Sequence, residues 1–305
     1  MTKHLGLYRQ LVGRVPHGDY ADFKPSNHSR EEFMEKISVA RHHFLTVRPY
    51  SLFAPTVAFT NRVVRLGEDD DVWGRTERED DYDAEERRVG SRDVWREILI
   101  RTKNPADGGI VTGEKKAIAI FNGDCPTVAL VQDDQLAVLH CGFRTLIREN
   151  HDEPNIIEVA MKHFDPKRTR ALVGHGIGSC CWVPEYDDKP EVLDPTKSRH
   201  PDLLAHCLSK TTEKSPFGAG HTSVDLYRLA KGLLAAVGIS EERIRINSRC
   251  TCCAEKNGKP LFWSYTRFKA GKQEKDGRNM SVLFLDSHLL NRQWAALTQE
   301  KTTEA

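Results

Sequence analysis

The amino-acid sequence predicts an α/β fold whose sheet is covered on both faces. Short apolar runs, typical of buried strands, recur at 117–121, 128–132, 135–139, 171–174, 243–246, 261–265 and 281–285. Apolar residues at helical spacing lie between these runs, at 144–149, 155–164, 201–209 and 223–237. A chain of 305 residues, 39% of them hydrophobic, can build one large domain or two small ones without disulfides.

Four segments follow one another along the chain. Residues 1–66 form an N-terminal segment, in which a capping box followed by apolar residues at helical spacing predicts a helix at 30–44. Residues 67–93 are more than half charged and nearly free of aliphatic side chains, which predicts a charged surface loop. The core is expected at 94–290, and 291–305 form a tail.

The helix at 223–237 has the clearest boundaries. Thr222 or Ser223 is expected to cap its start, and Gly238 is expected to end it. Asp225 also lies near this start, where capping and the helix dipole explain a carboxylate without any catalytic role.

Two strands of the core are expected to form a hairpin. A two-residue turn at Asp133 and Asp134 would pair Gln132 with Gln135, and therefore Thr127 with His140. Cys125 and His140 would then meet at the base of the hairpin. A thiolate beside an imidazole suits either a tetrahedral zinc site or a nucleophilic cysteine activated by histidine, although a buried cysteine beside a hydrogen-bonded histidine explains the pair equally well.

Charge and cysteine usage limit the class of protein. The formal net charge of +1 provides no overall field that would attract nucleic acid or a membrane surface, so neither is expected as a partner. The N-terminus lacks the apolar core of a secretory signal, which favours a cytoplasmic protein. The eight cysteines are then expected to be free thiols or metal ligands.

A group of five cysteines invites the hypothesis of a metal centre. They are Cys180, Cys181, Cys250, Cys252 and Cys253. The run Cys-Thr-Cys-Cys gives adjacent ligands rather than the two-residue gap of zinc knuckles, so we expect packing or redox sensitivity instead. Copper oxidase chemistry is not expected either, because the sequence contains no His-x-His pair.

Between Ala106 and Leu285 the sequence resembles the laccase-domain family, whose members are named multicopper polyphenol oxidase or purine nucleoside phosphorylase/adenosine deaminase. The resemblance rests on ordered blocks. The family blocks ADALVT, ADC-P-VLL and HAGWRG resemble, in this order, parts of ADGGIVTGEKKAIAIFNGDCPTVALVQDDQLAVLHCGFRTL in this chain. The family block GP-IG-CCYEV resembles GHGIGSCCWVP, and the family's helix that opens with LDL resembles HTSVDLYRLAKGLLAAVG. The segment from Cys250 to Leu285 resembles the family's run of CT, FFSYRRD and TGR.

The resemblance implies a single layered α-β-β-α domain with mixed sheets, similar to hydrolases of the cytotoxic necrotizing factor type. Residues 94–290 would be its catalytic core, and 1–66 a divergent N-terminal segment. The family's zinc is held by two histidines and one cysteine, and Cys125 and His140 match two of these ligands. Gly90 stands near the expected place of the other histidine. Four histidines remain as candidates for the third ligand, with His175 first among them: His42, His43, His175 and His221.

The implied activity is that of a zinc-dependent purine nucleoside phosphorylase and adenosine deaminase, with a purine nucleoside and phosphate as partners. Cys125 and His140 would be catalytic, together with Arg144 and Arg267. These two arginines would also bind phosphate, because guanidinium groups match its geometry. The matched positions of Arg278 and Asp124 make them further candidates for binding phosphate or substrate.

Two other classes of function stay open. A chain without the first zinc ligand could act as a metal-free Cys-His amidase or deamidase, for example on peptidoglycan precursors. Alternatively, it could be a catalytically degenerate paralogue that binds a nucleoside or a protein. Phe143 and Thr145, which replace the tryptophan and the last glycine of HAGWRG, motivate this second alternative.

Overall fold

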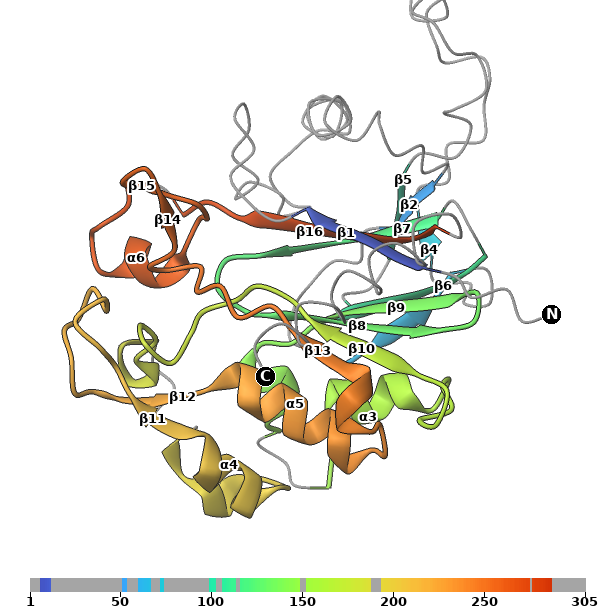
Figure 1. The fold of residues 1–305 in the computed structure, drawn as a ribbon, viewed down its shortest axis with the longest axis horizontal. Coiled ribbons are helices and arrows are strands. Elements are labelled where there is room, and N and C mark those ends of the chain that lie inside the picture. Colours follow the sequence, from blue (N-terminus) through green and yellow to red (C-terminus); the bar gives the residue numbers. More distant parts are fainter. Residues whose placement is uncertain are drawn as a thin grey trace, which may run out of the picture.

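Two stacked sheets form the centre of the molecule. The computed structural model describes residues 60–66, 106–113, 116–148, 152–187, 193–274 and 276–286, and the strands at 6–11, 51–53, 72–73 and 99–102. In Figure 1 one sheet lies above the other, and helices cover the outer face of the lower sheet. This arrangement confirms the mixed α/β fold and accounts for the β-β-α part of the four expected layers. The predicted helix at 30–44, the tail at 291–305 and most of the loop at 67–93 lie outside the described residues.

Each sheet has six strands and mixes parallel with antiparallel neighbours. The first sheet has the order β1 (Gly6–Leu11), β16 (Asn279–Asp286), β7 (Lys116–Asn122), β2 (Ser51–Phe53), β5 (Leu99–Thr102) and β4 (Val72–Trp73). The second has the order β13 (Ile244–Ile246), β10 (Arg170–Val173), β8 (Thr127–Gln132), β9 (Gln135–His140), β6 (Gly108–Thr112) and β3 (Val63–Arg65). Two hairpins complete the strands, formed by β11 (Leu208–Lys210) with β12 (Thr222–Val224) and by β14 (Glu255–Lys256) with β15 (Lys259–Pro260).

Both faces of the second sheet are buried, because side chains alternate along each strand. On β9, Leu136 and Val138 pack between the sheets against residues of β7 and β16. Ala137 and Leu139 face the opposite side and pack against the helices. The apolar runs of the sequence therefore have two partners, as the prediction of a sheet covered on both faces requires.

Five α-helices are described. They are α2 (Phe143–Leu146), α3 (Ile156–Met161), α4 (Pro201–Cys207), α5 (Leu226–Ala236) and α6 (Tyr265–Lys269), with short 3-10 turns at Pro184–Asp187, Pro195–Lys197 and Glu241–Arg243. In Figure 1, α3 and α5 lie along the outer face of the second sheet, and α4 lies beyond α5. None of the helices among the described residues is long and apolar enough to cross a membrane.

The expected cap of the helix at 223–237 is wrong, although the helix itself is confirmed. Thr222 and Ser223 belong to β12, and Asp225 is the N-cap, with its carboxylate accepting a hydrogen bond from the Arg228 N–H at 3.0 Å. Gly238 follows the end of the helix with φ of 94°, a left-handed conformation that glycine adopts without strain.

The expected strand at 261–265 is also wrong. The chain leaves β15 at Pro260, and α6 begins at Tyr265. Ser264 caps this helix by accepting a hydrogen bond from the Arg267 N–H, and a serine in this role favours a helix start over a continued strand. Similarly, the helix expected at 201–209 ends at Cys207, after which the chain enters β11.

Candidate active site

The predicted hairpin is confirmed residue by residue and forms the frame of the site. Gln132 pairs with Gln135, and Thr127 pairs with His140. Asp133 adopts a φ of 50°, as tight two-residue turns require. The loop 123–126 enters β8 from β7 and thus crosses from one sheet to the other, which places Cys125 at the base of the hairpin.

Cys125 and His140 lie side by side, as the sequence predicts. The Cys125 side chain is half-buried, and its sulfur is within hydrogen-bonding reach of the His140 ring, which is 3% exposed. The Asn122 side-chain amide donates a hydrogen bond to the backbone carbonyl of Cys125 and so fixes the loop that carries the thiol.

Asp107 is the third member of the site, and sequence reasoning gave it no role. Its carboxylate is fully buried and lies 3.0 Å from Nδ1 of His140, while its backbone carbonyl accepts the His140 N–H at 2.7 Å. The backbone N–H and the hydroxyl of Thr60 donate to the other carboxylate oxygen. A hydrogen bond from Nδ1–H to Asp107 turns Nε2 toward the rest of the site.

The negative charges around His140 determine its protonation. Burial lowers the pKa of the ring, but the interactions with the Cys125 side chain and the Asp107 carboxylate outweigh this effect and raise the pKa to about 9. The neighbouring Cys141 behaves differently, because burial and the charge of Cys125 raise the pKa of its thiol well above the ordinary value. Cys141 is fully buried whereas Cys125 is partly exposed, so Cys125 is the one of these two cysteines that a substrate can reach.

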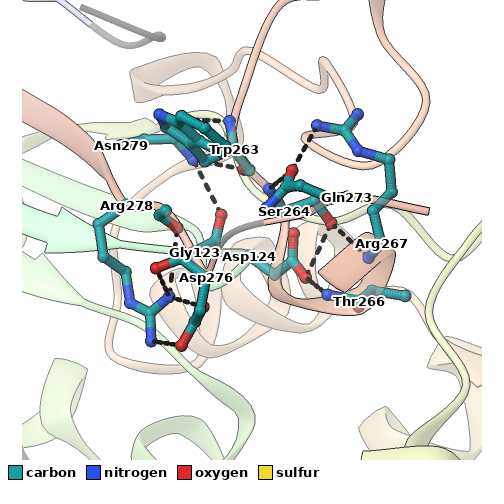
Figure 2. A network of polar contacts seen from close by, with 11 residues as sticks. Gly123, Asp124, Trp263, Ser264, Thr266, Arg267, Gln273, Asp276, Arg278 and Asn279 are labelled. Atoms are coloured by element: carbon teal, nitrogen blue, oxygen red, sulfur yellow. Dashed lines mark hydrogen bonds and ion pairs between the residues drawn. The ribbon is translucent and has the colours of Figure 1, made fainter. Parts of the chain in front are cut away.

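The Asp124 side chain lies in a buried polar network (Figure 2). Its carboxylate accepts hydrogen bonds from the Thr251 hydroxyl at 2.6 Å, the Ser264 hydroxyl at 3.1 Å and the Thr266 N–H at 2.7 Å. Burial raises the pKa of Asp124 despite these bonds, which act in the opposite direction. The carboxylate expected to bind substrate is thus engaged in joining the site loop to the start of α6.

The buried position of Arg267 argues against its predicted role in binding phosphate. Its side chain is buried, and its guanidinium donates to the backbone carbonyls of Cys252 and Phe262. A further bond of 3.1 Å reaches the side chain of Gln273. The buried guanidinium satisfies carbonyl groups of the surrounding loops, which is a structural task.

The other two arginines lie closer to solvent. Arg278 forms an ion pair with Asp276, and its guanidinium lies 5.9 Å from the centre of the Tyr265 ring (Figure 2). Arg144 is exposed on α2, four residues beyond His140. The role of Arg144 in binding an anion beside Cys125 and His140 stays a prediction.

His175 is not brought together with Cys125 and His140 as a third metal ligand. Its Nε2 lies 3.2 Å from the Asn247 amide, and its ring packs on Phe262 with centroids 5.1 Å apart. Burial, aided by the positive charge of Arg249, lowers its pKa to about 4. His221 lies elsewhere, with Nε2 3.1 Å from the Phe217 carbonyl, and His42 and His43 are outside the described residues.

One group of potential metal ligands does assemble within the described part of the chain. The sulfur atoms of Cys180, Cys181, Cys250 and Cys253 all lie within 4.8 Å of one another. Cys252 is not among them, although it is buried in the same apolar core and interacts with Cys181. Cys250 and Cys253 have the two-residue gap of zinc ligands, which the expectation of adjacent ligands in Cys-Thr-Cys-Cys overlooked.

Comparison with known proteins identifies relatives over most of the chain. A sequence model of the family described as multi-copper polyphenol oxidoreductase laccase matches residues 35–286. The purine nucleoside phosphorylase YlmD of Geobacillus stearothermophilus is 27% identical over 169 residues, which cover 54% of this chain and 57% of that protein. The match therefore spans little more than half the length of this relative.

Two solved structures share the fold. YfiH of Bacillus licheniformis, described as a hypothetical protein, is 18% identical, with a TM-score of 0.55 and 92% of each chain covered. The structure of YlmD from Geobacillus stearothermophilus is 16% identical, with a TM-score of 0.51, and covers 92% of this chain and 90% of that one. At these identities the likeness concerns the fold alone.

Proposed function

Because the chain belongs to the multi-copper polyphenol oxidoreductase laccase family, and a relative is named a purine nucleoside phosphorylase, we propose that it cleaves purine nucleosides with phosphate. The buried arrangement of Cys125, His140 and Asp107 carries this proposal. A half-buried thiol beside a charged, doubly anchored imidazole is costly to maintain in a core and is typical of functional sites.

The family implies zinc at this site, and the described residues fit it only in part. Cys125 and His140 have the donor types that zinc prefers, and Asp107 is the carboxylate that commonly orients a zinc-bound histidine. No third ligand joins Cys125 and His140 among the residues described. The described residues supply one ligand fewer than the three protein ligands of catalytic zinc sites. The proposed reaction therefore uses the side chains alone.

His140 would serve as the general acid of phosphorolysis. A phosphate oxygen forms a bond to C1′ of the ribose while the bond from C1′ to the purine nitrogen breaks and its electron pair moves to the base. Protonated His140 donates its Nε2 proton to the departing base. The interactions with Cys125 and Asp107 raise the pKa of the imidazole and so keep it charged until that step, and Arg144 binds the attacking phosphate.

A direct assay separates the reactions proposed for the family. The protein is incubated with inosine, guanosine or adenosine, with and without phosphate, and the products are separated by chromatography. We expect phosphate-dependent release of the free base, reduced about 100-fold or more in His140→Gln. His221→Gln, remote from Cys125 in its contacts, is the matched control and should retain activity. Formation of inosine from adenosine would instead support a deaminase.

The metal requirement is tested in the same assay. Zinc is added to one sample and a chelator to another, and the rates are compared with that of the untreated protein. Activity that needs zinc, together with one zinc per chain fewer in Cys125→Ala than in the unaltered protein, would assign the missing ligand to residues outside the described part of the chain. Unchanged activity supports the acid-base role of His140 alone.

A Cys-His hydrolase is the second candidate, and the bond between Asp107 and His140 favours it specifically. A nucleophile, a histidine base and a carboxylate that orients the histidine recur in hydrolases of unrelated folds. The Cys125 thiolate would attack an amide carbonyl, and the imidazolium of His140 would protonate the leaving amine. Amide hydrolysis that is abolished by iodoacetamide and by Cys125→Ser, without nucleoside cleavage, would establish this function. Nucleoside binding without turnover would indicate a binding protein.

A further inference from the structure

Four cysteine sulfur atoms converge from two segments that are distant in sequence. Cys180 and Cys181 follow β10, whereas Cys250 and Cys253 follow β13. The segments are joined by a parallel bridge between Gly176 and Cys250, and the Thr251 N–H donates to the Gly176 carbonyl at 2.8 Å. All four sulfur atoms lie within 4.8 Å of one another, separately from the group formed by Cys125 and His140.

We propose that Cys180, Cys181, Cys250 and Cys253 bind a single tetrahedral zinc ion. Zinc–sulfur bonds of about 2.3 Å require neighbouring sulfur atoms about 3.8 Å apart in a regular tetrahedron. The Cys180 sulfur lies 3.7 Å from that of Cys181 and 3.7 Å from that of Cys253. Four thiolates leave no open position for water or substrate, so the site is structural rather than catalytic.

The backbone around the cluster is suited to thiolates. The Gly178 N–H donates a hydrogen bond to the Cys250 sulfur at 3.2 Å. A side chain at Gly178 would place its Cβ 3.1 Å from the Cys180 sulfur, so the close approach of this loop depends on glycine. Zinc with four thiolates carries two negative charges, and the positive charge of Lys214 acts on Cys253 from nearby.

Other uses of the same cysteines fit less well. A disulfide needs two sulfur atoms about 2.05 Å apart, and it would consume only two of the four that converge. A cluster of several irons separates its thiolates more widely than one ion does. Tetrahedral coordination by four soft sulfur ligands favours zinc, with a single iron as the other ion of this geometry.

The zinc ion would brace the loop that carries Cys125. The Ile177 N–H donates to the backbone carbonyl of Asp124 at 2.6 Å, and the Thr251 hydroxyl donates to its carboxylate. Both donors lie within a few residues of the cysteine cluster. Occupation of the cluster would therefore fix the two segments that hold the 123–126 loop in place.

The test uses a background that cannot bind metal at the candidate active site. Full-length protein with Cys125→Ser and His140→Ala is purified without added metal, and zinc and iron are measured by elemental analysis. We expect about one zinc per chain. A further Cys253→Ser substitution should remove the zinc, whereas Cys207→Ser, at a buried free cysteine of α4 outside the cluster, should retain it.

Cobalt(II) provides a second readout that does not depend on the folding of the cysteine variants. Cobalt added to metal-stripped background protein should produce the intense visible and charge-transfer bands of tetrahedral thiolate coordination. Absence of both bound metal and these bands would overturn the proposal. The background protein keeps seven of the eight cysteines of the sequence, because Cys125 is replaced. A count of two free thiols fewer than these seven, which indicates a disulfide, or iron accompanied by inorganic sulfide, would also overturn the proposal. None of these outcomes depends on nucleoside cleavage.

Discussion

The carboxylate of Asp107 sets both the orientation and the charge of the His140 ring beside Cys125. The bond to Nδ1 orients the ring, and the adjacent negative charge favours the imidazolium. Neither effect requires Asp107 to touch a substrate. Asp107 is thus a positioning residue, and its contribution can be separated from that of His140 itself.

We expect Asp107→Asn to lower the pKa of His140 and to reduce the activity of the site by about 10- to 100-fold. The amide keeps the size of the side chain but removes the charge that favours the imidazolium. The pKa is measured by NMR titration of the histidine ring protons in chelator-treated protein. Asp134→Asn, in the exposed hairpin turn, is the control. An unchanged His140 pKa would contradict this assignment.

The raised pKa of His140 also predicts how stability depends on pH. The pKa is about 9 in the folded protein and about 6.5 in an unfolded chain, so protonated His140 stabilises the fold. This contribution is fully present below about pH 6.5 and is lost as the pH rises through about 9. Urea denaturation of chelator-treated protein should therefore show stability falling over this interval. The fall should be smaller in Asp107→Asn, and an equal fall in both would exclude the mechanism.

At the level of single residues, the sequence predicts the Cys125 and His140 pair but not the carboxylate that contacts it. Cys125 and His140 could be predicted as neighbours because a two-residue turn fixes the register of every residue in the hairpin. Asp107 could not, since the pairing of β6 with β9 joins strands that no short turn connects. An acidic residue directly before an apolar strand was the signal available for it.

The segment that follows β10 makes a close backbone contact with the 123–126 loop at Gly176. A Cβ at this position would lie 2.6 Å from the backbone nitrogen of Pro126, which directly follows Cys125. Backbone atoms cannot move aside as the end of a flexible side chain can. The contact thus couples the segment after β10 to the loop that carries the thiol.

We expect Gly176→Ala to destabilise the protein by about 1–3 kcal/mol and to reduce the activity of the Cys125 site. The substitution forces the 123–126 loop away from His140. Gly232→Ala is the matched control, because its Cβ would meet only the side chain of Leu203. Activity and urea denaturation are measured for both variants. Full activity in Gly176→Ala would show that the loop tolerates the displacement.

The predicted strand at 261–265 and the predicted cap of the helix at 223–237 are wrong for the same reason, because the local sequence fits more than one structure. The apolar run at 261–265 fits a strand as well as it fits a loop that precedes a helix, and only the hydrogen bond from the Arg267 N–H to the Ser264 hydroxyl distinguishes them. Similarly, three candidate caps stood within four residues at the start of α5. The pairing of β12 with β11 removed Thr222 and Ser223 from the choice and left Asp225.

Over the whole molecule, stability depends on two buried layers that share the second sheet. Leu136 packs in the layer between the sheets, and Leu130 packs in the layer beneath the helices. Both side chains are fully buried. The apolar runs of the sequence indicated burial on both faces, but they could not tell which strands belong to which sheet.

We expect Leu136→Ala and Leu130→Ala each to lower the free energy of unfolding by about 2–5 kcal/mol, because each substitution leaves a cavity in a packed layer. Asp134 is exposed in the hairpin turn, so Asp134→Ala provides a surface control. Unfolding in urea is followed by tryptophan fluorescence and by circular dichroism. A loss below about 1 kcal/mol for Leu136→Ala would contradict the packing of the two sheets as one core.

The pairing of β1 with β16 has a consequence for synthesis on the ribosome. Gly6 pairs with Asp286, so the first sheet joins the two most distant described strands of the chain. β7, in the middle of that sheet, also lacks its antiparallel neighbour until β16 has been synthesised. The second sheet and its helices can assemble from residues already translated, whereas the first sheet closes only after β16 has left the exit tunnel. High contact order of this kind slows folding and leaves apolar strand edges open in the meantime, where a chaperone that binds such edges would act.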